Sequence, residues 1–320
     1  MRIRLLRAAS AVVIFITAGF LAGPVSEAAA ARSDNKYLVE ADRAYYQGKI
    51  EQSLELYEQA VLLEPANPSA LISLGVTYAE KGQWDKAAEK LHRAAELAPK
   101  RAEVYMNLSL VYGEKKDFDR AIAFAQKAVV LDPGNSSAHH TLGVAYETAG
   151  QNLKAIEAYK KGVQVDGKNT ELLLTLGNLY SRERRLDEAV ATYEQVMATD
   201  PQNVFAYSNA AYVYQEKGDN AKAIGYLEKA VQLDSRDEIA WYDLGQAYTR
   251  DAKHDKAIPC YQKVLGLNPK SYKACLSLAM AYESKRDLEK SAEYYTKTLS
   301  LTDNPRLKEA ILKQITRTSE

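Results

Sequence analysis

The chain has 320 residues, of which 47% are hydrophobic and 26% charged, a composition that can bury a core and excludes an intrinsically disordered protein. Its 42 basic side chains equal its 42 acidic ones, so no net charge attracts it to nucleic acid or to an anionic membrane. We therefore expect no nucleic-acid partner.

The first 30 residues have the layout of a secretory signal peptide. Three arginines open the segment, an uncharged apolar run follows over residues 8–23, and small residues surround a predicted cleavage position between Ala29 and Arg32. The alternative is an uncleaved membrane anchor, but an apolar run of about 16 residues is shorter than the roughly 20 that span a bilayer. We expect cleavage and a periplasmic mature protein. In the alternative, the uncleaved segment anchors the chain, and only then do we expect membrane contact.

The rest of the chain repeats with a period of 34 residues. The stretches LGVTYAEKGQWDKA (74–87) and LGVAYETAGQNLKA (142–155) agree at eight of fourteen positions and start 68 residues, or two periods, apart. Blocks of this length run without insertion or deletion from Asp34 to Pro305. The predicted repeats are 34–67, 68–101, 102–135, 136–169, 170–203, 204–237, 238–271 and 272–305.

Certain positions of each block hold the same kind of side chain. The eighth is always small, the eleventh is tyrosine in seven blocks, and the twentieth is Ala or Ser. This spacing predicts two helices per repeat, in which the small residues let the backbones approach and the tyrosines fill the space around the contact. Glycine at the fifteenth position, as at Gly150, predicts the end of the first helix, and proline at the thirty-second predicts the end of the second. Gly167 and Ser235 replace that proline in the fourth and sixth repeats, where we expect softer helix ends.

The pattern resembles the tetratricopeptide repeat (TPR) family. In the seventh repeat the family motif is met by Trp241, Leu244, Gly245, Tyr248, Ala257, Tyr261 and Pro269. The resemblance covers residues 34–305 and implies an all-α fold, a right-handed superhelical solenoid of eight helix-turn-helix repeats. In the segment 306–320, Leu307, Ile311 and Ile315 share one stripe, and we expect a helix there that caps the last repeat. The alternative for this segment is a partner-binding helix.

The sequence holds no catalytic constellation, and we expect no enzyme activity, no cofactor and no metal site. His139 and His140 are adjacent, so their side chains diverge by about 100° on a helix and do not point at one metal ion. The basic cluster at 182–185 falls at a turn between helices, where we expect it to be solvated. Cys260 and Cys275 lie on helices that should be neighbours. We expect them to be small buried hydrophobic residues, with a disulfide as the alternative.

The family resemblance also implies where a partner binds. In tetratricopeptide repeats the first helices line a concave face, and ligands touch positions 2, 5, 9, 12 and 13 of the repeat. No lysine occurs at position 5 or 9 of this chain, which argues against the family's carboxylate-clamp subclass. The candidate partner-binding residues at these positions are Met106, His140, Asn178, Phe205, Tyr212, Tyr242 and Gln246. Phe205, Tyr212 and Tyr242 lie outside the packing stripe formed by positions 4, 7, 8 and 11, so we expect them to be free to bind.

Two functions fit these observations. The favoured one is an exported, non-catalytic scaffold or adaptor that docks a protein or peptide in the concave groove and helps to assemble an envelope complex. The apolar and aromatic lining of the groove predicts a partner with an apolar or aromatic segment. The alternative is a self-associating structural scaffold that stacks through its repeat ends.

Overall fold

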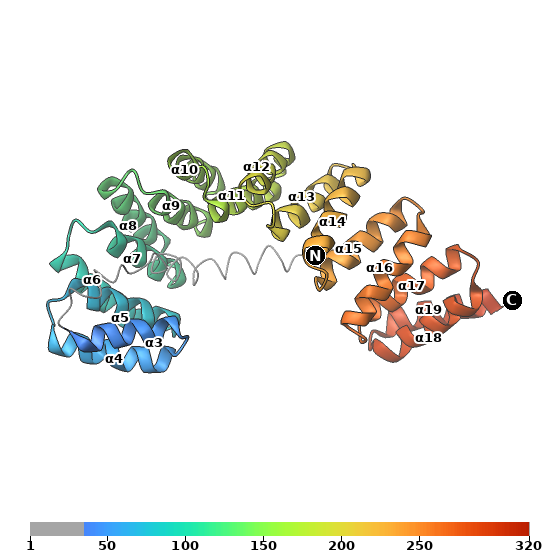
Figure 1. Ribbon diagram of the computed structural model, residues 1–320, viewed down its shortest axis with the longest axis horizontal. Helices are drawn as coiled ribbons and strands as arrows, with labels where there is room; N and C mark the ends of the chain where they lie inside the picture. The colour runs from blue at the N-terminus through green and yellow to red at the C-terminus, as the bar shows by residue number, and fades with distance from the viewer. Residues whose placement is uncertain (1–34, 320) are drawn as a thin grey trace. The chain divides into compact units, whose positions relative to one another are not determined.

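The computed structural model describes residues 35–319, and every regular element in this range is an α-helix (Figure 1). The first helices of the repeats are α3 (Lys36–Tyr46), α5 (Pro68–Glu80), α7 (Ala102–Glu114), α9 (Ser136–Thr148), α11 (Thr170–Arg182), α13 (Val204–Glu216), α15 (Glu238–Arg250) and α17 (Tyr272–Ser284). The second helices are α4 (Ile50–Leu63), α6 (Trp84–Leu97), α8 (Phe118–Leu131), α10 (Asn152–Val165), α12 (Leu186–Thr199), α14 (Asn220–Leu233), α16 (His254–Leu267) and α18 (Leu288–Leu301). A final helix, α19 (Pro305–Ser319), follows them.

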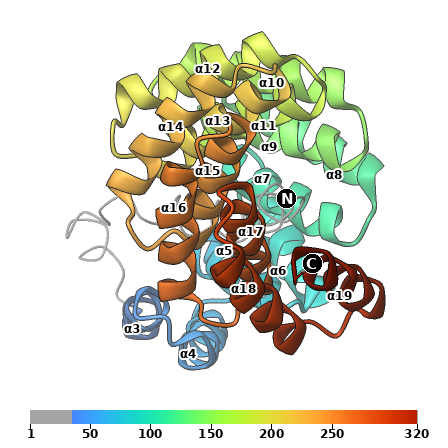
Figure 2. The same cartoon turned by 90° about the vertical axis from the view of Figure 1, so that its right-hand side faces the viewer.

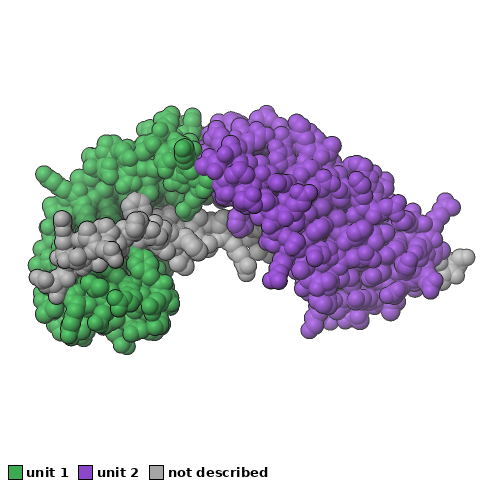
Figure 3. Space-filling view, in the orientation of Figure 1, with its two compact units in different colours: residues 1–172 green, residues 173–320 purple. Residues whose placement is uncertain are grey.

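The helices form two compact units, one up to Leu172 and one from Leu173 on (Figure 3). In the first unit the second helices α4, α6 and α8 pack against the first helices that follow them, α5, α7 and α9. In the second unit every helix from α12 to α19 packs against the next one along the chain. This serial packing is that of a helical solenoid, in which each repeat buries the apolar stripe of its neighbour. The predicted all-α solenoid fold is confirmed.

The predicted signal peptide lies outside the described residues. Between residues 35 and 319, none of the helices combines the length and the apolar character that a bilayer span requires.

The small residue at the eighth position lets the two helices of a repeat touch. A Cβ atom added to Gly143 would lie 2.2 Å from the ring of Tyr159, and one added to Gly245 would lie 2.5 Å from Tyr261. Both tyrosines are buried and stand at position 24 of the second helix. The first helix therefore carries glycine because the ring of the second helix occupies the space of a Cβ atom.

The turn between the two helices of a repeat passes through one residue of positive φ, at the fifteenth position. Glycine fills it in four repeats, with φ between 69° and 78°. In the other four repeats, φ lies between 54° and 62° at Lys116, Arg184, Ala252 and Arg286. Both kinds of turn are closed by the same two main-chain hydrogen bonds. The amides of Gly150 and Lys116 each donate to the carbonyl three residues before them, at 2.9 Å. The amide of the following residue donates to the carbonyl five residues before it. The repeat thus imposes the left-handed conformation even where no glycine is present.

Each second helix ends at the same position of its repeat, whether or not a proline follows. Where Gly167 and Ser235 replace the proline, α10 and α14 stop at the same position as the other second helices, and the softer ends expected there stay a prediction. An aspartate just after each of these helices supplies the stop. Asp166 and Asp234 accept hydrogen bonds from the main-chain N–H two residues on, at 3.0 Å and 2.9 Å, and so close a turn.

The tyrosine at the eleventh position joins a repeat to the one before it at five junctions. Its hydroxyl shares a hydrogen bond with the side chain at position 25 of the preceding repeat in the pairs Glu58–Tyr78, His92–Tyr112, Gln126–Tyr146, Glu228–Tyr248 and Gln262–Tyr282. Ion pairs add to four junctions, at Glu51–Lys81, Asp85–Lys115, Asp187–Lys217 and Asp255–Lys285. A large apolar residue would fill the same space but would leave the polar partner unbonded, which explains the preference for tyrosine.

Helix α19 covers the apolar face of the last repeat and lies against α18 (Figures 1 and 2). Ile311 is buried with Tyr295 and Ala279, and Leu307 and Ile315 pack around this cluster. The stripe read from the sequence is thus the packing face of a capping helix.

Candidate binding surface

Exposed large apolar side chains fall on different helices in the two units. In the second unit three of the five lie on first helices, where Phe205 of α13, Ile239 of α15 and Met280 of α17 are 64%, 49% and 53% exposed; the other two are Leu288 of α18 and Leu312 of α19. In the first unit most of them lie on the second helices instead, at Leu62, Leu63, Val130, Leu153 and Val165. The family resemblance implies that ligands bind on the first helices, so the second unit holds the better candidate for an apolar binding surface.

Positions 2, 5 and 9 of a helix lie on one face, since they are three and four residues apart. Phe205 and Ile239 stand at position 2, Tyr242 at position 5, and Tyr212 and Met280 at position 9 of their repeats. We call these five residues the first-helix patch. Tyr212 and Tyr242 are half-buried, so they offer part of each ring beside the more exposed members.

Tyr212 is held near a pair of opposite charges. Burial and the carboxylate of Glu216 raise the pKa of the Tyr212 hydroxyl, and Arg184 opposes this shift. Arg184 forms an ion pair with Glu216. The hydroxyl of Tyr212 therefore keeps its proton at neutral pH and can donate a hydrogen bond to a partner.

Tyr242 is not free of packing, contrary to the expectation from its spacing. Its ring centroid lies 5.7 Å from that of Tyr261, and its hydroxyl is 3.3 Å from Ser277 Oγ. It belongs to the partly buried residues around the core of the second unit. A side chain at position 5 reaches the second helix of its own repeat and the first helix of the next, which a helical wheel of one helix does not reveal.

Met106 and His140 are buried, each 4% exposed. The ring of His140 lies 5.5 Å from that of Tyr159, and burial lowers the pKa of His140 to about 4. Neither side chain is exposed to a partner. Their predicted role in partner binding stays a prediction. Gln246 is half-buried on α15, one helical turn after Tyr242.

Asn178 on α11 and Asn209 on α13 present unused hydrogen-bonding groups. Asn178 Oδ1 accepts from the hydroxyl of Tyr193 at 2.7 Å and from Asn209 Nδ2 at 2.9 Å. Within residues 35–319, the amide NH2 of Asn178 and the amide oxygen of Asn209 have no hydrogen-bond partner, and both residues are half-buried. One donor and one acceptor are what a main-chain peptide group of a partner requires.

Ile239 and Met280 were not among the residues selected from the sequence. Both occupy ligand positions of the repeat, and both are large and apolar, so position and residue type together were the available signal. Their exposure, 49% and 53%, is comparable to the 64% of Phe205.

The other chemistry of the described residues is structural. The basic cluster at 182–185 is largely neutralised, because Arg184 pairs with Glu216 and Arg185 pairs with Glu188 at 2.6 Å. Cys260 and Cys275 are free, buried thiols, and burial raises the pKa of Cys260 to about 11. Nowhere in the described range do three His, Cys, Asp or Glu side chains gather as metal ligands.

Comparison with solved structures finds the same fold in several proteins. The crystal structure of MamA is 29% identical, with a TM-score of 0.50 over 52% of this chain and 91% of that one. The C-terminal part of a TPR repeat-containing protein from Cytophaga hutchinsonii is 19% identical, with a TM-score of 0.61 over 75% of this chain and 98% of that one. PilF from Pseudomonas aeruginosa is also 19% identical, with a TM-score of 0.53 over 68% of this chain and 98% of that one. The last two likenesses concern the fold alone.

Comparison with protein families leads to the same repeat. Among curated proteins none matched this chain. Family models described as tetratricopeptide repeat match residues 38–102, 77–136, 148–211, 206–237, 239–271 and 274–309. These matches indicate no enzyme family, and together they span well over half of the chain. The chain belongs to the tetratricopeptide repeat family.

Proposed function

We propose that the chain is a non-catalytic interaction scaffold that docks an apolar segment of a protein partner against the first-helix patch. The observation that carries the proposal is the exposure of Phe205, Ile239 and Met280 on three first helices of one unit. None of these side chains is needed to bury the core of its own repeat, yet each would lose water contact under a partner. Large anchors of this kind commonly contribute about 2 kcal/mol or more each to an interface.

The partner's chemistry follows from the groups beside the patch. An apolar or aromatic segment would cover Phe205 and Ile239, and its main chain would find a donor on Asn178 and an acceptor on Asn209. Recognition of main-chain groups fixes the path of a segment without specifying its sequence, while the apolar contacts select its side chains.

Export of the scaffold is part of the proposal. It rests on the arginines, the apolar run and the small residues of the first 30 positions, and it places the scaffold in the periplasm, where it would help to assemble an envelope complex. N-terminal sequencing of the protein from its native cells tests this step. A mature chain that starts between Ala29 and Arg32 supports export, and a chain that keeps Met1 argues for the anchored alternative.

The alternative function, stacking of copies through the repeat ends, has less support. At one end α19 covers the apolar face of the eighth repeat, and at the other end α3 exposes the charged residues Lys36, Glu40 and Arg43. Stacking requires complementary apolar ends. Light scattering over a concentration series separates the two functions, because an adaptor keeps its mass and a stacking scaffold grows.

The docking proposal is tested by capture of partners from an envelope extract. The test variant combines Phe205→Ser with Ile239→Ser. The control combines Leu62→Ser with Val130→Ser, which removes apolar groups that are more exposed still, at 74% and 78%, from second helices. We expect the test variant to lose the captured protein and the control to retain it, with both melting like the wild type. Equal capture by the test variant and the control would overturn the assignment of the patch.

A further inference from the structure

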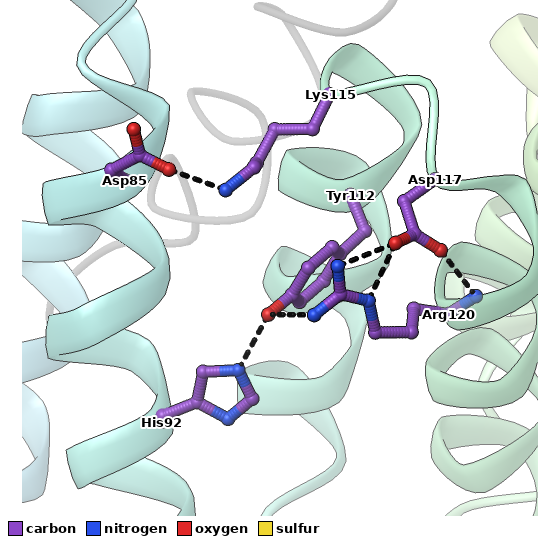
Figure 4. A network of polar contacts seen from close by, with 6 residues as sticks. All are labelled: Asp85, His92, Tyr112, Lys115, Asp117 and Arg120. Carbon is purple, nitrogen blue, oxygen red and sulfur yellow. Dashed lines mark hydrogen bonds and ion pairs between the residues drawn. The ribbon is translucent and has the colours of Figure 1, made fainter.

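The junction between the second and third repeats carries a histidine in the bond that joins repeats (Figure 4). His92 Nε2 lies 2.9 Å from the hydroxyl oxygen of Tyr112, and Arg120 Nη1 donates to the same oxygen at 3.2 Å. Arginine can only donate, so the tyrosine oxygen accepts from Arg120 and its own O–H is free to donate to His92. The O–H makes this bond when Nε2 of His92 carries no proton, the state in which the ring nitrogen can accept.

Charged groups from three elements lie at this junction. Arg120 of α8 stacks on the ring of Tyr112 at 4.1 Å and is held by Asp117, whose Oδ2 accepts from Arg120 Nε at 2.6 Å. Lys115, in the turn before α8, is paired with Asp85 at the start of α6, and Glu96 lies one turn beyond His92 on α6. The apolar wall is the ring of Phe124, whose centroid is 5.7 Å from that of His92. Among the described residues, α5 contributes no hydrogen bond or ion pair to His92.

The environment disfavours a charged imidazole. Burial and the nearby guanidinium of Arg120 lower the pKa of His92, and Glu96 opposes the shift. A second proton on His92 would aim two cationic donors at one hydroxyl oxygen and would leave the O–H of Tyr112 without its acceptor.

We propose that the His92–Tyr112 bond is a pH-sensitive link between the second and third repeats, closed at neutral pH and opened in mildly acidic solution. The other four junctions with this bond use Glu58, Gln126, Glu228 and Gln262. Histidine is the side chain whose ordinary pKa lies in the mildly acidic range and amides do not titrate, so we expect the His92 junction to be the mildly acid-sensitive one of the five. The proposal does not depend on the proposed function.

The sign of the effect follows from the lowered pKa. The folded chain binds the proton less readily than the unfolded chain, whose histidines titrate near pH 6.5. The stabilising contribution of the link is therefore complete above about pH 6.5 and is lost as the pH falls through the lower pKa of the folded state.

The test exchanges histidine and glutamine between two junctions of the same unit. His92→Gln keeps a hydrogen-bonding side chain that the chain already uses at Gln126, and Gln126→His moves the titrating group to the next junction. Hydrogen exchange of the α6 and α7 amides is compared between about pH 7.5 and about pH 5.5, after correction for intrinsic rates. We expect wild type to lose several-fold more protection in α6 and α7 than His92→Gln, and Gln126→His to show the added loss in α8 and α9. Equal losses in wild type and His92→Gln would overturn the proposal.

A second measurement needs no variant to remain folded under acid. The imidazole of His92 is titrated in the folded wild-type chain by NMR, with its resonance assigned by its absence from the His92→Gln spectrum. A midpoint below about 6.5 supports the link, and a midpoint at or above this value overturns it, because it would mean that the folded junction favours the charged ring.

Discussion

At the scale of single residues, the left-handed turn position offers a matched pair of substitutions. Ala252 has a φ of 54°, where a Cβ atom is strained, and Gly150 has a φ of 74° with no atom within 4 Å of an added Cβ. We expect Ala252→Gly to stabilise the chain and Gly150→Ala to destabilise it, each by about 1 kcal/mol. Urea unfolding followed by circular dichroism measures both. Changes of the same sign would show that the turn conformation is not what separates glycine from alanine here.

Close helix packing predicts opposite effects of one substitution at two helical glycines. Gly143→Ala places a methyl group 2.2 Å from the ring of Tyr159, so the ring or the helix must shift, and we expect a loss of about 1–3 kcal/mol. Gly225 on α14 has open space around it, and Gly225→Ala should add about 0.5–1 kcal/mol through helix propensity. Chemical denaturation decides the matter, and a gain at position 143 would contradict the close approach.

The buried ring of His140 makes stability depend on pH. Burial lowers its pKa to about 4, so the folded chain holds it neutral while the unfolded chain protonates it near pH 6.5. Its contribution to stability is full above about pH 6.5 and falls towards pH 4, by roughly 2–3 kcal/mol. His140→Leu, which uses the residue found at the same position in other repeats, should remove this part of the acid sensitivity. Parallel stability curves for wild type and variant between about pH 7 and pH 4.5 would contradict the prediction.

The sequence predicted which face of each first helix a residue lies on, but not how deeply it is buried. Phe205 is as open as its position suggested, while Tyr242 packs against Tyr261 and Met106 is enclosed. The periodicity of one helix contains no information on how far the neighbouring repeat reaches over that face. Burial at these positions depends on the side chains of two repeats at once, which is why exposure had to come from the structure.

At the scale of helices, the cap predicts a difference between two adjacent residues of α19. Ile311 is buried against the last repeat, whereas Leu312 is exposed. Ile311→Ala should destabilise the C-terminal repeat by about 2–5 kcal/mol, and Leu312→Ala should leave stability within about 0.5 kcal/mol. Hydrogen exchange in α17 and α18 reports the difference. Similar exchange in the two variants would mean that α19 does not cover this repeat.

The helix ends show which structural features the repeat period predicts and which it does not. The 34-residue period predicted two helices in every block, because the small and large residues recur at helical spacing. Gly167 and Ser235 stand where other repeats have proline, yet the helices end at the same position, so proline alone does not account for the helix ends. The aspartate one residue earlier was visible in the sequence, and its side chain can close the same turn through a hydrogen bond.

At the scale of the whole molecule, the unbroken period does not reveal the boundary between the two compact units or the different placement of their exposed apolar residues. The repeat spacing continues through Leu172 and Leu173 without insertion, so the boundary between the two compact units has no counterpart in the pattern. The exposure of Phe205, Ile239 and Met280 on first helices could be predicted only in part, because the sequence does not separate buried from exposed apolar residues. The repeat period therefore gives the positions of the patch residues, and the fold determines which of them are exposed.

Site-specific photocrosslinking in the native cells tests the central claim most directly. A photoreactive phenylalanine derivative is introduced at Ile239 in the first-helix patch, or at Val130 on a second helix, and both sites are exposed to solvent. We predict a discrete crosslinked partner from position 239 that Phe205→Ser abolishes, and no such product from position 130. A partner that crosslinks from Val130 but not from Ile239 would contradict the account and would move the binding surface to the second helices of the other unit.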